Sequence, residues 1–336
     1  MCIRDSYITD KKSLPAMLPF CAAMAGAGFA FVGWVPAYIL LMCTVVIIGM
    51  ASATYHPQAS KTVNFLSSDN NKAANMGIFS LGGNAGMAVG SILMAFLLTL
   101  PGGLHNTMYF VLPGLLVFGL MMKYMPEYKR VNLEHNLKVQ AAKKSGAVQK
   151  IPYGGLALVL FFIFMRSTIH TGLSTYLPLF FINFRNAEPA FASMLVSCFL
   201  LGGVAGTYVG AVLSDRLGAR RIILGSVLCS IPAIWLIANV THPAAVLAAV
   251  VLAGFSIIGS FATTTILAQT MLPNNVGMAA GLTIGFSVGM GGFGVTILGF
   301  LADNYGLPFV MNLMTVLPVI ATLTAFKIPV PPQMQK

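Results

Sequence analysis

The chain has 336 residues, of which 57% are hydrophobic and only 8% are charged, and its mean hydropathy is +0.84. Soluble globular proteins carry about 25% charged residues, so this composition excludes that class and indicates an integral membrane protein. The net charge of +11 is then a guide to membrane topology rather than a sign of nucleic-acid binding, and we expect no nucleic acid as a partner.

Continuous apolar runs predict ten transmembrane helices, because a helix needs about 20 apolar residues to cross a bilayer. The runs do not alternate in polarity and are rich in Leu, Ala, Met and Gly, which favours helices over the strands of a barrel. The predicted spans are residues 14–33, 35–63, 74–99, 106–125, 153–182, 190–213, 221–240, 243–270, 276–302 and 307–327.

The first four spans form a predicted bundle within residues 1–125, after a polar start that contains Asp10. His56 precedes Pro57, which frees a backbone carbonyl in mid-helix and favours a kinked, cavity-lining segment. We interpret His56 as a proton-responsive or substrate-contacting group. Asn84, a polar residue in an apolar run, lines the same cavity or hydrogen-bonds between helices.

Residues 126–152 carry several Lys side chains together with Glu127 and Glu134. This composition predicts a basic cytoplasmic linker that contacts lipid headgroups and joins two bundles. The second bundle is predicted at residues 153–328, with six helices, followed by a cytoplasmic tail at 329–336.

Arg166 lies in the middle of the apolar run Leu158 to Leu179. A charge at that depth costs about 2.5 to 3.5 kcal/mol on insertion scales, so Arg166 must face a cavity or a partner. No Asp or Glu lies at the centre of a predicted helix. We therefore expect an anionic substrate group, or a carboxylate outside this sequence, to neutralise Arg166. The alternative is snorkelling or hydrogen bonding to unwound backbone carbonyls.

Three further polar residues lie in the second bundle. His170 is one turn beyond Arg166 on the same helical face. For His170 we favour packing or a hydrogen bond in the cavity wall over a substrate contact. Tyr176 and Gln269 either line the cavity or join neighbouring helices.

A short charged loop separates two apolar runs and contains Asp215, Arg216, Arg220 and Arg221 around Gly218. The Asp can accept hydrogen bonds from the N-terminal amides of the next helix, and the Arg residues can pair with carboxylates or lipid phosphates. We interpret these four residues and Asp10 as a cytoplasmic gate.

The pattern Gly-x-x-x-Gly-x-x-x-Gly occurs three times and places small residues on one helical face, as in helices whose backbones approach closely. The predicted packing residues are Gly82, Gly86 and Gly90, then Gly202, Gly206 and Gly210, then Gly281, Gly285 and Gly289.

Cysteine and histidine spacing gives no support for a disulfide framework, a metal site or a cofactor. The sequence also has no phosphate-cradling loop, and its acidic residues lie in loops or at helix ends. A membrane-embedded enzyme would need a nucleophile with its base, a metal cluster or paired carboxylates, so it is disfavoured.

Several of these motifs resemble the fosmidomycin-resistance branch of the major facilitator superfamily. They are the Gly49 to Ser60 segment with His56-Pro57, the Gly82-Gly83-Asn84-Ala-Gly86 run, Ala268 to Gly281, and Gly289-Met290-Gly291-Gly292; the charged loop at Asp215 resembles the superfamily's cytoplasmic-loop signature. Gln58 and Ser91 stand where branch members usually have Glu and Pro, which removes a carboxylate from the cavity region.

The resemblance implies two six-helix bundles that meet through the second and fifth helices of each. We therefore expect an all-α integral membrane protein with a major facilitator fold that lacks the first two of twelve helices; a complete ten-helix protein is the alternative. It also implies a secondary active transporter for proton-coupled efflux of a small molecule, with fosmidomycin-like phosphonates as candidate substrates. Uptake or exchange of an organic anion and a nonfunctional fragment stay open as alternatives.

The basic residues give the orientation. If Met1 is cytoplasmic, 17 of the 19 Lys and Arg residues lie inside, Arg185 lies outside and Arg166 lies within a helix. The positive-inside rule then predicts a multi-pass protein of the plasma (inner) membrane with both termini cytoplasmic. Its expected partners are a small, anionic substrate, protons and the lipid bilayer, and we expect a monomer.

Overall fold

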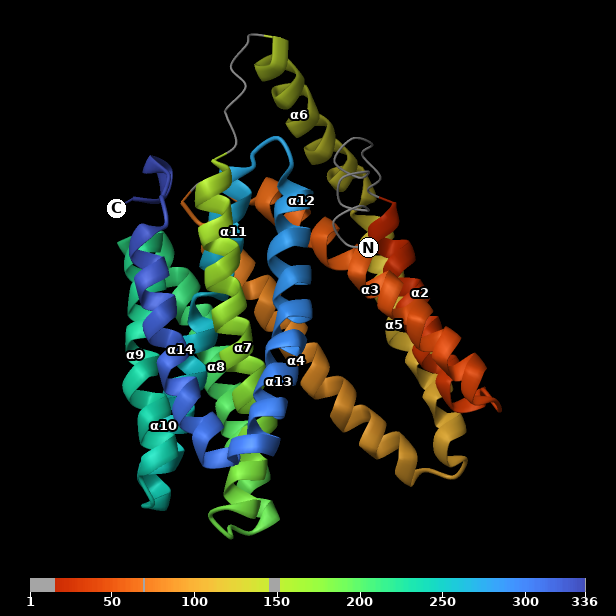
Figure 1. Cartoon of the computed structure of the whole chain (residues 1–336). Coiled ribbons are helices and arrows are strands. Elements are labelled where there is room, and N and C mark those ends of the chain that lie inside the picture. The colour runs from red at the N-terminus through yellow and green to blue at the C-terminus, as the bar shows by residue number, and fades with distance from the viewer. Residues whose placement is uncertain (1–15, 69, 145–151, 336) are drawn as a thin grey trace. The chain divides into compact units, whose positions relative to one another are not determined.

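The computed structural model describes residues 16–68, 70–144 and 152–335, and within these ranges the chain is helical apart from short connections (Figure 1). The membrane helices are α2 (Met17–Phe31) with η1 (Val32–Trp34), α3 (Tyr38–Leu66), α4 (Lys72–Thr99), η2 (Gly103–Phe110) with α5 (Val111–Lys123), α7 (Tyr153–Asn183), α8 (Pro189–Leu217), α9 (Ala219–Asn239), α10 (Pro243–Gly259), α11 (Phe261–Met271), α12 (Val276–Ala280), α13 (Phe286–Tyr305) and α14 (Leu307–Lys327). In the described part of the chain, nine spans meet the length and hydropathy needed to cross a bilayer. α4 adds a further helix of 28 residues. The all-α membrane fold is thus confirmed.

The chain divides into two compact units, and each unit consists of three separate stretches of the sequence. The first comprises residues 1–68, 82–150 and 272–281, and the second comprises residues 69–81, 151–271 and 282–336. α4 therefore begins in the second unit and continues in the first. The predicted bundle boundaries, at residues 125 and 153, stay predictions, as do the two helices expected before Met1.

In the first unit, α2 packs against both α3 and α5. A Cβ atom at Gly26 would lie 2.7 Å from the Cα of Gly114, so glycine at this position allows α2 and α5 to touch backbone to backbone. The ends of α2 and η2 are joined by Thr107, whose Oγ1 donates to the carbonyl of Ala30 at 2.9 Å and accepts from the amide of Gly33 at 3.1 Å.

In the second unit, α8 packs closely along α10, and α7 packs against α13 and α14. Gly202, Gly206 and Gly210 lie on the face of α8 that meets α10. A Cβ atom on any of them would come under 3.0 Å from a backbone carbonyl of Val251, Phe255 or Gly259 respectively. The apolar core around them includes the fully buried rings of Phe162, Phe180 and Phe199.

Two predicted spans are not continuous α-helices. The run predicted at residues 243–270 is interrupted at Ser260, between α10 and α11. The run predicted at 276–302 contains a π-helical segment, Gly281–Gly285, between α12 and α13. Both interruptions lie at glycine-containing positions, where a side chain does not restrict the backbone.

Single glycines make two sharp corners between neighbouring helices. Gly218 joins α8 to α9 with φ +91°, and Gly306 joins α13 to α14 with φ +83°. Each glycine amide donates to a carbonyl four residues earlier, Ser214 at 3.0 Å and Ala302 at 2.8 Å. The left-handed backbone at both corners favours glycine because other residues are strained there.

Part of the predicted linker is a helix. α6 (Met125–Lys144) has 20 residues, and Arg130 pairs there with Glu127 at 2.5 Å and with Glu134 at 3.9 Å. Oppositely charged residues three or four positions apart stabilise an exposed helix, which explains why this polar segment is ordered. Its inner side includes Asn132, and His135 stacks on Phe65 of α3 with 3.9 Å between ring centroids.

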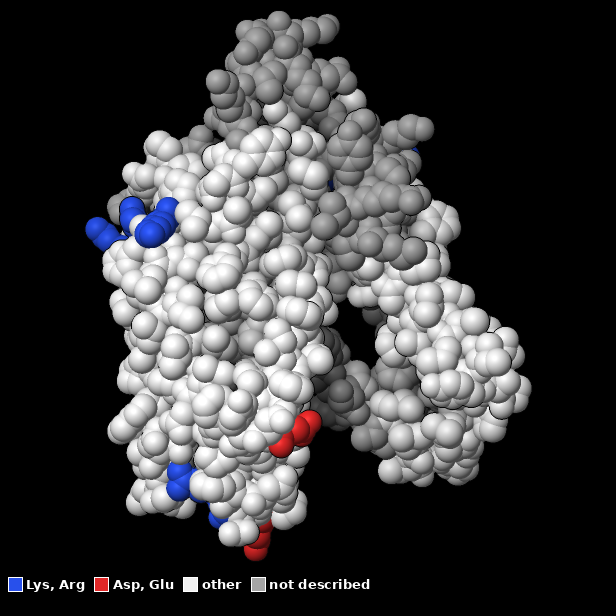
Figure 2. All heavy atoms as spheres, in the orientation of Figure 1, with Lys and Arg blue, Asp and Glu red and all other residues white. Residues whose placement is uncertain are grey.

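Charged side chains are unevenly distributed along the helices. On the face shown in Figure 2, Lys, Arg, Asp and Glu gather near the helix ends of the second unit, and the surface between them is free of charge. An uncharged belt of this kind suits the hydrocarbon core of a bilayer, which is about 30 Å thick.

Candidate functional site

Arg166 is the buried charge at the centre of the candidate site. It lies on α7 with 4% of its surface exposed. Its Nη1 donates to Oγ1 of Thr264 on α11 at 3.0 Å, and its guanidinium carbon lies 5.1 Å from the centroid of the Phe261 ring. No Asp or Glu of the described residues forms an ion pair with it. Arg166 therefore connects α7 to the first turn of α11, and the other N–H groups of its guanidinium stay available to a ligand.

Hydroxyl groups surround this contact. Thr264 Oγ1 lies 2.9 Å from the carbonyl oxygens of Ser260 and Phe261, and the hydroxyls of Ser167 and Ser287 are 2.5 Å apart. The hydroxyls of Thr168, Ser260 and Thr263 are buried and have no hydrogen-bond partner among the described residues. A polar, donor-rich region at membrane depth is typical of a ligand pathway, because apolar packing does not require it.

The other predicted residues of the second unit differ in their surroundings. His170 is half-buried one turn further along α7, with its ring 5.6 Å from that of Phe199. Tyr176 donates from its hydroxyl to the carbonyl of Val295 at 2.8 Å, which joins α7 to α13. Gln269 is 1% exposed on α11. Tyr176 thus has a clear packing role, whereas His170 and Gln269 stay candidates for the site.

His56 and Asn84 belong to the first unit and are both half-buried. His56 lies on α3 directly before Pro57, and its ring is 5.9 Å from that of Tyr55. The neighbouring Gln58 is 5% exposed, and its amide nitrogen has no partner among the described residues. Polar groups thus gather around the Pro57 kink of α3.

Asp215 contacts a helix that the sequence did not indicate. Its carboxylate accepts from the backbone amides of Ala73 at 3.2 Å and Ala74 at 2.7 Å, at the start of α4. The carboxylate therefore caps the positive end of a helix some 140 residues earlier in the chain. The expectation that it accepts from the amides of the following helix stays a prediction.

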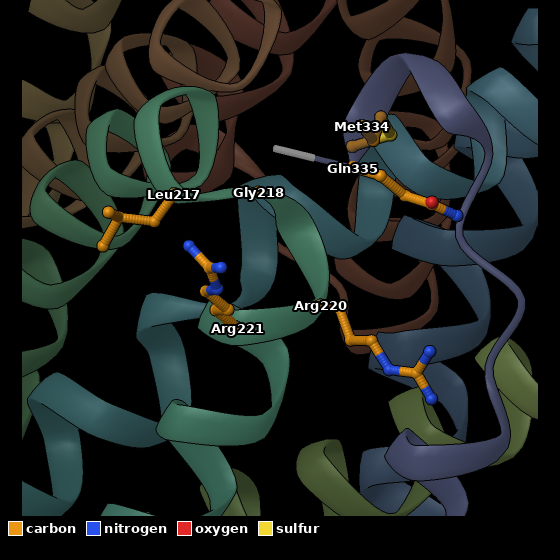
Figure 3. A pocket seen from close by; sticks show the side chains of 6 residues that line it. All are labelled: Leu217, Gly218, Arg220, Arg221, Met334 and Gln335. Carbon is orange, nitrogen blue, oxygen red and sulfur yellow. The ribbon is translucent and has the colours of Figure 1, made fainter.

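The Arg residues of the charged loop are exposed. Arg220 donates to the carbonyl of Phe326 at 2.5 Å, near the end of α14. Arg220 and Arg221 line an open pocket of about 200 Å³ with Leu217, Gly218, Met334 and Gln335, in which the two guanidinium groups point in different directions (Figure 3). Arg216 is exposed on the last turn of α8, and Asp10 lies outside the described residues.

For the other two predicted glycine patterns, the described residues do not show the close backbone contact that Gly202, Gly206 and Gly210 make. No atom of the described residues comes within 4 Å of a Cβ built at Gly82, Gly86, Gly90 or Gly289. Gly281 and Gly285 begin and end the π-helical segment. Close helix approach at these six glycines stays a prediction.

Sequence reasoning missed Phe261, Ser260, Thr263 and Thr264. The sequence did contain an indication of them, because the run Ser260-Phe-Ala-Thr-Thr-Thr265 is unusually rich in hydroxyl groups for an apolar span. Among the described residues there is no group of three or more His, Cys, Asp or Glu side chains that could hold a metal ion.

Comparison with known proteins decides the family. The family model of the Major Facilitator Superfamily matches residues 6–187 and 156–336. The chain belongs to the Major Facilitator Superfamily. It is 29% identical over 327 residues to the uncharacterised MFS-type transporter YfnC of Bacillus subtilis (strain 168), which covers 96% of this chain and 79% of that protein. It is 26% identical over 325 residues to the fosmidomycin resistance protein of Escherichia coli (strain K12), covering 95% of this chain and 78% of the relative.

The solved structure of the Escherichia coli fucose:proton symporter FucP has the same fold. The two structures superpose with a TM-score of 0.76 at 13% identity, over 98% of this chain and 87% of FucP. The major facilitator fold is therefore established for this member of the superfamily.

Proposed function

We propose that this superfamily member is a secondary active transporter that exports a small anionic molecule by alternating access. The observation that carries the proposal is Arg166, a guanidinium buried at membrane depth whose described contacts are a hydroxyl and an aromatic ring. Burying an unneutralised charge is costly, so the favourable state is one in which a mobile anion occupies the site. Transport follows if that anion is released when the site opens to the other side.

The candidate substrate class is a phosphonate such as fosmidomycin, because one relative carries fosmidomycin resistance in its name. Protons are the proposed coupling ion, with His56 as the titratable group of the first unit and His170 as that of the second. Asn84 and Gln269 are proposed to line the same route. The protein is proposed to act as a monomer.

We propose a plasma-membrane orientation with both termini in the cytoplasm. In the second unit, helix alternation places Arg216, Arg220, Arg221 and Lys327 at one end, whereas Arg185, Glu188 and Asp303 lie at the other. The excess of basic residues at the first end supports a cytoplasmic position for it. The contact of Asp215 with α4 then lies at the cytoplasmic end and serves as the gate.

Fosmidomycin accumulation in a sensitive bacterial strain tests this function. Cells that make the protein should accumulate less drug than cells with an empty vector. Dissipating the proton gradient should abolish the difference. Arg166→Ala should raise accumulation to the empty-vector level, because the anion loses its counter-charge, and Arg166→Lys should retain part of the activity.

The control is Arg130→Ala, because Arg130 is an exposed residue that pairs only with Glu127 and Glu134 of its own helix. It should leave accumulation unchanged. All variants are compared at equal amounts of protein in the membrane. Equal accumulation by Arg166→Ala and the unchanged protein would remove Arg166 from the transport mechanism.

A further inference from the structure

The interruption between α10 and α11 lies inside a membrane span. Ser260 separates the 17-residue α10 from the 11-residue α11, within the span Pro243–Met271. The first backbone bond of α11 runs from the amide of Thr264 to the carbonyl of Ser260, at 2.9 Å.

Arg166 contacts the first turn of α11. Its guanidinium carbon lies over the ring of Phe261, at 5.1 Å from the centroid, and its Nη1 donates to Thr264. A guanidinium buried without a counter-charge is costly, so an anion beside this contact is favourable.

Two side-chain hydroxyls at the interruption also lack partners. Ser260 and Thr263 are each 0% exposed, and neither hydroxyl has a hydrogen-bond partner among the described residues. Buried hydroxyls normally find a partner, so an unpartnered pair beside a helix end indicates a missing acceptor. Their neighbours differ: Ser256 donates to Ala253 at 3.1 Å and Thr265 donates to Phe261 at 3.0 Å.

We propose that the α10–α11 interruption is an oxyanion site, in which Arg166 and the hydroxyls of Ser260 and Thr263 bind one anionic group. The group is that of the transported molecule, so this inference rests on the proposed function. Arg166 has five N–H donors, of which one is used by Thr264. This many donors suit a tetrahedral oxyanion with three free oxygens, such as a phosphonate, better than a carboxylate with two.

Ligand-dependent thermal unfolding tests the site without requiring transport. The purified full chain in lipid nanodiscs is heated with increasing methylphosphonate at constant ionic strength, and separately with acetate and with the uncharged dimethyl ester of methylphosphonate. Binding to the folded state raises the melting temperature with ligand concentration. We expect a saturable rise with methylphosphonate, a smaller one with acetate and none with the ester. Equal shifts with methylphosphonate and the ester would overturn the site.

Matched variants locate the binding. Ser260→Ala and Thr263→Val remove the two unpartnered hydroxyls, and each should weaken methylphosphonate binding about tenfold, as expected for a lost hydrogen bond to a charged group. Ser256→Ala and Thr265→Val remove similarly buried hydroxyls that already have partners, and they should leave the affinity unchanged. Arg166→Lys should keep the fold and weaken binding. If the Ser260 and Thr263 variants bind as tightly as their controls, the proposal is wrong.

The same variants separate this inference from the proposed function. Loss of methylphosphonate binding in Thr263→Val with unchanged drug export would show that the site does not bind the transported molecule, and would leave the proposed transport function intact. Saturable binding at this site by a protein that exports no anion would support the site and contradict the proposed export.

Discussion

Gly206 is a residue at which a single added methyl group has a definite consequence. A Cβ atom there would lie under 3.0 Å from the backbone of Phe255 on α10. We therefore expect Gly206→Ala to destabilise the second unit by about 1–3 kcal/mol, the usual cost of overpacking. Thermal unfolding of the purified protein measures the change.

Gly225 is the matched control for Gly206. It lies inside α9, and no described atom is within 4 Å of its Cβ position. Gly225→Ala should be neutral or stabilising by up to about 1 kcal/mol, because alanine favours a helix over glycine. If both variants melt at the same temperature, the close α8–α10 contact does not limit stability.

At the residue scale, the sequence was a good guide to what is unusual and a poor guide to its partners. Arg166 could be singled out because charge is rare in an apolar run. Thr264 could not be paired with it, since 98 positions separate them and only the packing of α11 on α7 brings them together. Tyr176 was left open between cavity and packing, and its bond to Val295 depends likewise on a contact between distant helices.

Helix α4 depends at its first turn on a carboxylate from another helix. Asp215 accepts from the amides of Ala73 and Ala74, and an Asn at that position has only one acceptor oxygen and no charge. Asp215→Asn should therefore speed hydrogen exchange of these amides roughly tenfold, as expected for losing a charged cap.

Mass spectrometry of peptides from residues 72–81 measures this exchange. Asp303→Asn is the control, because Asp303 is an exposed carboxylate near the end of α13. It should not alter exchange in α4. Unchanged exchange in Asp215→Asn would show that the start of α4 is held without the charge, and the proposed gate would lose its anchor.

At the element scale, hydropathy predicted the spans well, because crossing a bilayer imposes a length and an apolar composition on each helix. It did not predict where helices break. Ser260 lies inside one continuous apolar run, and a break in the helix there leaves hydropathy unchanged. α6 was missed as a helix because its stability comes from Arg130 pairs with Glu127 and Glu134, which a composition-based prediction treats only as polarity.

The orientation of the whole molecule can be measured with two cysteines. Glu188 precedes α8, and Gln335 lines a pocket with Leu217 at the other end of that helix. A helix of 29 residues spans about 43 Å at 1.5 Å per residue, so the two positions lie on opposite sides of a bilayer.

Glu188→Cys and Gln335→Cys are made separately in a cysteine-free version of the chain. A membrane-impermeant maleimide should label position 188 in intact cells and position 335 only after the cells are opened. The reverse pattern would invert the proposed orientation, and labelling of both positions in intact cells would contradict a single fixed topology.

The glycine corners at Gly218 and Gly306 also limit how far the ends of neighbouring helices can separate. A single residue extends at most about 3.6 Å, so α9 must begin at the membrane surface where α8 ends, and α14 where α13 ends. A helix of either pair that shifts along the membrane normal therefore moves the adjoining end of its partner with it.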